Sequence, residues 1–234
     1  MGFGPRKDGS PQAEGCVTRQ SKGWLASESS SFPARPITKM KIILASNSPR
    51  RAQILREVGI AHEILAAQID ETALPGETGP AMVARLAEAK ARAVAASIDV
   101  GDNEWVIVGA DTTVELEGEI FGKPRDSAHA REILARLSGR THHVLTGIFL
   151  LRLPGNATRA AVEKSSVTLA PIDEKEIDAY VATGEPLGKA GAYAIQGLAG
   201  RFVPKIDGCY FNVVGLPLAR LYALLRELGW RDGG

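Results

Sequence analysis

Acidic and basic side chains stand at separate points of the chain where phosphate chemistry could use them. Asp111 directly follows an apolar run, Glu71 lies in a polar segment, and Lys123 stands between a glycine and a proline. Carboxylates can hold a divalent cation, which neutralises phosphate charge and lowers the pKa of a bound water, and cationic side chains can hold departing phosphates. As a set these residues suit phosphoryl chemistry, although each alone has an ordinary interpretation as a turn or solvated residue.

The segment that follows the apolar run Lys41–Ala45 could bind an anion. The run predicts a short buried strand, and Ser48 and Pro49 are favourable residues for starting a helix directly after it. The free N–H groups and the positive dipole end of that helix would face the turn, next to Ser46 and two arginines whose guanidinium groups match phosphate oxygens. The alternative is a capped helix with two solvated arginines.

Lys90 interrupts the apolar stripe of a predicted helix over residues 80–98. The stripe consists of apolar residues at three- and four-residue spacing, namely Val83, Leu86, Ala87 and Val94. A lysine in such a stripe either snorkels to solvent, which is the usual case, or pairs with a carboxylate or faces a wet cleft.

The elements needed to position these residues alternate along the chain, which predicts an α/β fold with a mixed sheet. We expect strands at 41–45, 63–66, 105–110, 113–116, 141–153 and 160–169, and short ones near 193–195 and 201–203. We expect helices from Pro49 to about Val58 and at 80–98, 126–137, 173–183 and 217–228. Because ligands gather at the carboxyl ends of strands in open α/β sheets, Asp111 is well placed for a metal or a water.

Composition narrows the classes of function. The formal net charge of +1 and the lack of a long Lys/Arg run argue against a nucleic-acid binder, and no apolar run approaches the length of a membrane span. Cys16 and Cys209 lack a paired spacing, which argues against a zinc site or a disulfide framework and favours a cytoplasmic location. The four histidines show no metal-ligand spacing.

Residues 1–39 differ from the rest of the chain. Gly, Ser, Pro and charged residues dominate there without helical or strand periodicity, which predicts a disordered N-terminal extension. We expect the folded domain at 40–230, and our hypothesis is that Met40 is the natural start.

Seven ordered motifs between Met40 and Trp230 resemble the Maf family of nucleotide pyrophosphatases. In chain order they are Ala45-Ser46-Asn47-Ser48-Pro49-Arg50-Arg51, Ile69-Asp70-Glu71, Arg85-Leu86-Ala87-Glu88-Ala89-Lys90-Ala91, Gly109-Ala110-Asp111-Thr112, Gly122-Lys123-Pro124, Ala192-Tyr193-Ala194-Ile195-Gln196-Gly197 and Asn212-Val213-Val214-Gly215-Leu216-Pro217-Leu218. The segment 1–39 has no counterpart, and Cys209 stands where relatives often have a serine or aspartate.

The resemblance implies a fold like that of the inosine triphosphate pyrophosphatases, an elongated mixed β-sheet with flanking helices and two lobes around a central cleft. It implies hydrolysis of dTTP and UTP, or modified pyrimidine triphosphates, to the monophosphate and pyrophosphate. The cofactor would be Mg²⁺ or Mn²⁺, which assists water attack on the α-phosphate.

The resemblance also assigns roles to single residues of this chain. Asp111 aligns with the proton acceptor and Glu71 with a metal-binding acid, so these two would hold the cation. Lys90 and Lys123 belong to the catalytic set, and Ser46 and Arg51 to the phosphate-binding set. We expect no nucleic-acid or membrane partner. Family members often form homodimers, and the sequence leaves the oligomeric state open.

Three positions of the resemblance concern the base. Arg50, Thr112 and Gln196 match the type that prefers dTTP and UTP, because Arg and Gln can hydrogen-bond the carbonyl and imide edge of a pyrimidine. The alternative 7-methyl-GTP type typically has a tryptophan in place of Arg50, which would stack on a cationic purine. A second alternative is a regulatory binding protein of septum formation. A P-loop or Rossmann protein is disfavoured, since no complete glycine-rich fingerprint follows a strand.

Overall fold

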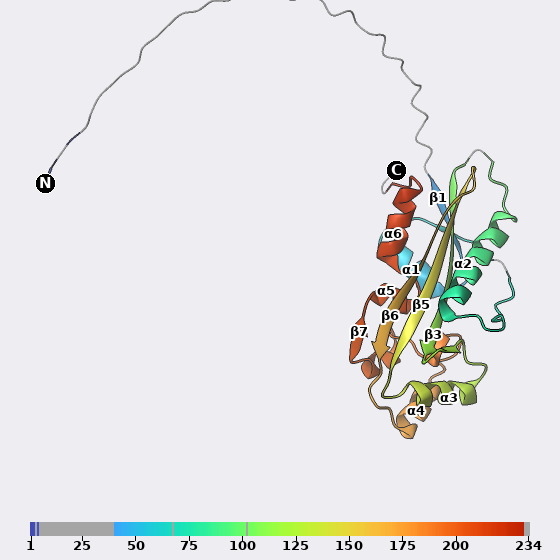
Figure 1. Ribbon diagram of the computed structural model, residues 1–234, viewed down its shortest axis with the longest axis vertical. Coiled ribbons are helices and arrows are strands. Elements are labelled where there is room, and N and C mark those ends of the chain that lie inside the picture. The colour runs from blue at the N-terminus through green and yellow to red at the C-terminus, as the bar shows by residue number, and fades with distance from the viewer. Residues whose placement is uncertain (3, 5–39, 67, 102, 232–234) are drawn as a thin grey trace, which may run out of the picture. The chain divides into compact units, whose positions relative to one another are not determined.

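A seven-stranded mixed sheet forms the centre of the part of the chain that the structure describes (Figure 1). This computed structural model describes residues 1–2, 4, 40–66, 68–101 and 103–231. Contacts divide the chain into the units Met1–Pro36 and Ile37–Gly234, and the fold and site below belong to the second. Apart from residues 1, 2 and 4, the extension predicted at 1–39 lies outside the described residues.

The strands follow the order β2-β1-β3-β5-β6-β7, and β4 pairs with β3 beside this path. β1 pairs in parallel with β2 and β3, and the remaining pairs are antiparallel. The strands are β1 (Lys41–Ala45), β2 (Glu63–Ile64), β3 (Trp105–Leu116), β4 (Glu119–Phe121), β5 (Thr141–Leu153), β6 (Ala157–Thr168) and β7 (Lys205–Asp207). The prediction of a mixed α/β sheet is therefore confirmed.

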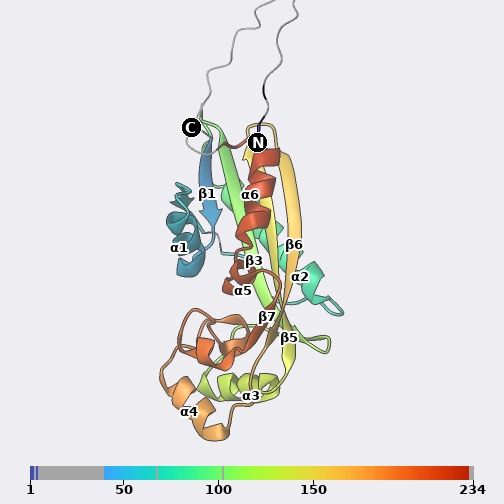
Figure 2. The same ribbon diagram turned by 90° about the vertical axis from the view of Figure 1, so that its left-hand side faces the viewer.

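Helices cover both faces of the sheet and one of its ends. They are α1 (Pro49–Glu57), α2 (Gly79–Ala95), α3 (Ser127–Leu137), α4 (Glu174–Ala182), α5 (Tyr210–Val214) and α6 (Leu218–Glu227), with 3₁₀ turns η1 (Ala190–Ala192) and η2 (Leu198–Phe202). Figure 2 shows α3 and α4 at the end of the sheet remote from α6. Among the described residues no helix is long and apolar enough to cross a membrane.

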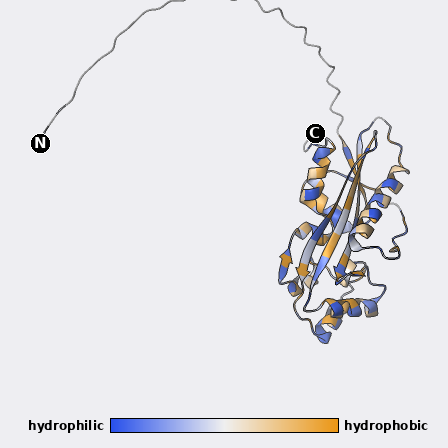
Figure 3. Ribbon diagram, in the orientation of Figure 1, coloured by the Kyte–Doolittle hydropathy of each residue, from blue (hydrophilic) through white to orange (hydrophobic). Residues whose placement is uncertain are grey.

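Strand alternation explains how the core is divided. Successive side chains of a strand point to opposite faces, so Ile42 and Leu44 of β1 pack with α1 and α6, whereas Ile43 and Ala45 pack with α2. A separate apolar cluster lies among α3, α4 and η2. Hydrophobic and hydrophilic residues alternate along α3 and α6 in Figure 3, as helices with one buried face require. Apolar packing thus covers both faces of the sheet, with a third cluster among α3, α4 and η2.

The predicted break after Ala110 is wrong, because β3 continues through Asp111 to Leu116. The parallel pairing with β1 ends at Ala45↔Gly109, where β1 turns away into α1. Pairing with β5 continues past that point, with Asp111 opposite Gly147. Asp111 therefore lies inside a strand, just beyond the carboxyl end of the neighbouring parallel strand.

Two short strands predicted near 193–195 and 201–203 are also wrong. Residues 193–195 follow the 3₁₀ turn η1, in which Gly191 has a φ of 69°, and form no strand, and residues 201 and 202 belong to η2. The strand in this region is β7, which pairs with β6. The sequence did not indicate α5. β2 and α2 are each shorter than predicted, ending at Ile64 and Ala95.

Two glycines let α2 lie against the sheet. A Cβ atom on Gly109 would stand 2.0 Å from the carbonyl oxygen of Ala87, and one on Gly147 would stand 2.3 Å from that of Val83. Lys90 follows Ala87 by one helical turn, and Asp111 follows Gly109 by two residues on β3. The close approach therefore sets the distance between these two site residues.

Gly109→Ala should destabilise the fold, because its methyl group would force α2 away from β3. We expect the free energy of unfolding to fall by about 3 kcal/mol, as for severe overpacking, in urea titrations. Gly122→Ala is the matched control, since its added methyl group meets nothing within 4 Å. Equal urea midpoints for both variants would contradict the role assigned to this contact.

Candidate active site

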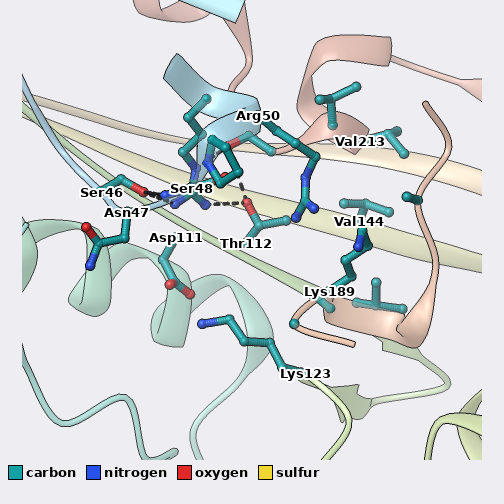
Figure 4. Close-up of a pocket in the computed structure, with 18 of the residues that line it drawn as sticks. Ser46, Asn47, Ser48, Arg50, Asp111, Thr112, Lys123, Val144, Lys189 and Val213 are labelled. Carbon is teal, nitrogen blue, oxygen red and sulfur yellow. Dashed lines mark hydrogen bonds between the residues drawn. The ribbon is translucent and has the colours of Figure 1, made fainter. Parts of the chain in front are cut away.

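One cleft of about 350 Å³ gathers residues from across the chain. Its lining comes from the β1–α1 turn, from α2 and β3, from the loop 188–196 and from the segment 213–215. All nine predicted site residues line it: Ser46, Arg50, Arg51, Glu71, Lys90, Asp111, Thr112, Lys123 and Gln196. Figure 4 shows Asp111 and Lys123 facing one another near the β1–α1 turn.

A network of acids and cations lies on one side of this cleft. The ammonium nitrogen of Lys90 is 2.6 Å from Oδ1 of Asp111 and 2.7 Å from Oε1 of Glu71. The other Glu71 oxygen, Oε2, is 3.0 Å from Nζ of Lys123. Lys90 thus does not snorkel to solvent but bridges two carboxylates, which explains a lysine in an apolar stripe.

Burial and charge act in opposite directions on Glu71. Partial burial raises its pKa, but hydrogen bonds and charges from Lys90 and Lys123 outweigh burial and lower the pKa to about 2. The side chain remains 42% exposed, whereas that of Asp111 is 11% exposed. Glu71 is therefore an ionised carboxylate at the mouth of the cleft, and Asp111 lies deeper.

Arg51 is a buried brace between three segments. Its guanidinium donates to the carbonyl oxygens of Gly215 (2.7 Å) and Ala110 (3.0 Å), and to the hydroxyls of Ser46 and Thr112 (both 2.9 Å). These bonds join the β1–α1 turn, β3 and the α5–α6 turn. Four of its five N–H groups are directed at protein acceptors. One N–H group therefore remains for the expected contact with phosphate.

The β1–α1 turn exposes donors at the start of α1. Ser48 occupies the predicted N-cap position, but its side chain makes no capping hydrogen bond. Instead the Ser46 hydroxyl accepts from the N–H of Ser48 (3.2 Å) and from Arg51. Because both contacts use oxygen lone pairs, the Ser46 hydroxyl hydrogen is free to donate. An uncapped helix start with such a hydroxyl is suited to an anion.

The opposite side of the cleft is more apolar and was only partly predicted. Val144, Val213 and Tyr193 line it, and the Tyr193 hydroxyl lies 2.8 Å from Nε2 of the buried His142. Arg50 extends into this part of the cleft from α1, and burial lowers its pKa (Figure 4). Thr112 lies between the two sides, bonded to Arg51 and to Thr146 at 3.0 Å.

Lys189 was not predicted as a site residue, yet it lines the cleft. Its ammonium group donates to the carbonyl oxygen of Glu185, and burial together with the charge of Arg50 lowers its pKa. The sequence signal was a lysine next to Gly188 and close to Gly191, two glycines that both have a positive φ.

Carboxylates and cations that converge in one cleft of a mixed α/β sheet define a phosphate-handling domain. The chain belongs to the Maf family. The model of this family, described as Maf-like protein, matches residues 41–228. The dTTP/UTP pyrophosphatase of Anaeromyxobacter sp. (strain Fw109-5) is 49% identical over 192 residues, covering 81% of this chain and 90% of that protein. The dTTP/UTP pyrophosphatase of Carboxydothermus hydrogenoformans is 46% identical over 192 residues, which cover 82% of this chain and 100% of that protein. The family prediction is thus confirmed.

Among solved structures, the Staphylococcus aureus Ham1 protein aligns with a TM-score of 0.37 and 17% identity. The alignment covers 56% of this chain and 72% of that protein.

Proposed function

We propose that this protein hydrolyses dTTP and UTP to the nucleoside monophosphate and pyrophosphate. The observation that carries the proposal is the pair of carboxylates, Asp111 and Glu71, held by the ammonium group of Lys90 inside one cleft. The relatives named above support the substrate class. A protein that only bound a partner would have no use for a buried carboxylate placed to take a proton.

The two sides of the cleft divide the substrate. The phosphates would lie on the polar side, against the Ser46 hydroxyl, the start of α1, Lys90 and Lys123. Arg51 would act mainly by fixing that wall, since most of its donors bind protein groups. The base would lie on the more apolar side, near Val144 and Tyr193.

Asp111 would act as the general base. Lys90 binds its Oδ1, and within the described residues Oδ2 has no hydrogen-bond partner. Oδ2 could take a proton from a water that attacks the α-phosphorus in line, and the bond from that phosphorus to the bridging oxygen would break. Lys123 would stabilise the negative charge that develops on the departing pyrophosphate.

The donor set fits a divalent cation of the Mg²⁺ type. Asp111 and Glu71 supply hard carboxylate oxygens. The described part of the chain has no group of three His, Cys, Asp or Glu side chains that could hold a metal by itself. Mg²⁺ commonly uses one or two carboxylates, waters and substrate phosphates, so the substrate would complete this set. A bound Mg²⁺ or Mn²⁺ would neutralise phosphate charge and lower the pKa of water.

We assign the reading of the base to Arg50, Thr112 and Gln196. Arg50→Trp should lower kcat/KM for dTTP and UTP by roughly 10- to 100-fold, because a hydrogen bond from a charged donor contributes about 1.5–3 kcal/mol. Arg56→Trp, an exposed arginine of the same helix, is the matched control. The check is a panel of pyrimidine and purine triphosphates, including 7-methyl-GTP. An unchanged profile would show that Arg50 does not contact the base.

We place the protein in the cytoplasm with a small-molecule nucleotide as its partner. Among the described residues Cys209 forms no disulfide, which fits a reducing compartment.

The direct test is to identify the products. Purified protein with dTTP or UTP and Mg²⁺ or Mn²⁺ should release dTMP or UMP and pyrophosphate in equal amounts, and a chelator should abolish turnover. Release of inorganic phosphate and the diphosphate, or the same rate with chelator present, would refute the proposed reaction.

A further inference from the structure

The loop that carries Gln196 is held by one carboxylate from outside the cleft lining. Glu185 lies between α4 and η1, and its Oε2 accepts the N–H of Leu198 (3.0 Å) while its Oε1 accepts that of Ala199 (3.4 Å). Both N–H groups belong to the start of η2, two and three residues after Gln196.

Tyr180 ties the other end of the same loop to this carboxylate. Its hydroxyl donates to Oε1 of Glu185 (2.8 Å) and accepts the N–H of Ala194 (3.2 Å). Burial, the largest influence, raises the pKa of Tyr180, so the hydroxyl stays protonated as a donor. The ring is 1% exposed and packs edge-on against Phe202. Tyr180 and Glu185 together therefore bracket residues 195–197.

Close packing adds to these hydrogen bonds. A Cβ atom on Gly197 would stand 2.3 Å from the Glu185 carboxylate, so the carboxylate lies directly against the backbone beside Gln196. Gln196 itself is exposed, and within the described part of the chain its side chain makes no hydrogen bond. Its backbone, held by Glu185 and Tyr180, therefore determines where its amide can reach.

We propose that Glu185 and Tyr180 form a positioning pair that sets the nucleotide preference by fixing the Gln196 loop. This inference rests on the proposed function, in which Gln196 contacts the base. The pair lies apart from the acids and cations of the phosphate side. Loosening it should therefore weaken discrimination between bases while the hydrolysis step continues.

The test compares kcat and KM for dTTP and dGTP in Glu185→Ala, Glu185→Gln and Tyr180→Phe. Glu185→Ala should lower the kcat/KM ratio of dTTP over dGTP about tenfold, mainly through the KM for dTTP, with kcat within about twofold of wild type. Glu185→Gln keeps an acceptor oxygen and should recover most of the ratio. Tyr180→Phe removes one of the two ties and should lower it about threefold. Glu174→Ala, on the exposed first turn of α4, is the control.

A double variant separates this inference from the proposed function. If Glu185 acts through Gln196, Glu185→Ala combined with Gln196→Ala should discriminate no worse than Gln196→Ala alone. One outcome would overturn the positioning pair and leave the proposed function standing. In it, Gln196→Ala abolishes the preference for dTTP over dGTP, but Glu185→Ala and Tyr180→Phe both keep it. No pyrimidine triphosphate turnover by wild type would instead refute the function. Should Glu185→Ala fail to fold, Tyr180→Phe and Glu185→Gln decide the matter alone.

Discussion

Asp111→Asn should lower kcat for dTTP hydrolysis by roughly 10²- to 10⁴-fold, the usual contribution of a positioned general base. The amide keeps the size of the side chain and one oxygen that can face Lys90, but it cannot accept a proton from water. It also replaces one of the two carboxylates available to a divalent cation. Initial rates at saturating dTTP and Mg²⁺ measure the effect.

Asp207→Asn provides the matched control, because it makes the same chemical change at an exposed position of β7 outside the cleft lining. It should turn over at the wild-type rate. Near-normal turnover in Asp111→Asn would remove Asp111 from the role of proton acceptor.

Lys90→Met should lower kcat/KM by roughly 10²- to 10³-fold, comparable to the loss of one fixed electrostatic contact to a transition state. The ammonium group contacts Asp111 and Glu71 at 2.6 and 2.7 Å. Without it, two carboxylates would repel each other within the cleft, and one cation near the phosphates would be lost. Steady-state kinetics with dTTP would show the change.

Two further variants show whether geometry or charge matters at this position. Lys90→Arg keeps the charge on a planar fork, which differs from the compact ammonium group, and should retain only partial activity. Arg92→Met removes a cation from the exposed side of the same helix, where Arg92 pairs with Glu88. Equal effects of Lys90→Met and Arg92→Met would mean that the bridge has no catalytic importance.

The sequence predicted the parts of the site that depend on local patterns. The position of Lys90 inside an apolar helical stripe is unusual and can be seen from the sequence alone. The structure explains it, because two carboxylates bind the ammonium group. The strand, turn and helix at 41–57 follow from an apolar run ended by Ser48 and Pro49. The resemblance of the seven motifs to the Maf family then indicated which distant residues share the cleft.

Long-range contacts determine what the sequence could not predict. The hydrogen bond from the Arg51 guanidinium to the carbonyl of Gly215, 164 residues away, has no signal in the sequence, and the phosphate-binding role expected of Arg51 stays a prediction. Asp111 appeared to follow a strand, but pairing with β5 extends β3 beyond it. The segment 190–202 contains the 3₁₀ turns η1 and η2, and Tyr180 of α4 and Glu185 of the following loop hold the residues between them. No periodicity of the sequence indicates these contacts.

Isotope incorporation is the most direct measurement of whether this cleft brings water to the α-phosphorus. Hydrolysis of dTTP in H₂¹⁸O by the wild-type protein should place one ¹⁸O atom in dTMP and none in pyrophosphate, as mass spectrometry of both products would show. Label in pyrophosphate would mean attack on the β-phosphorus and would contradict the arrangement of Asp111, Lys90 and Lys123 around the substrate.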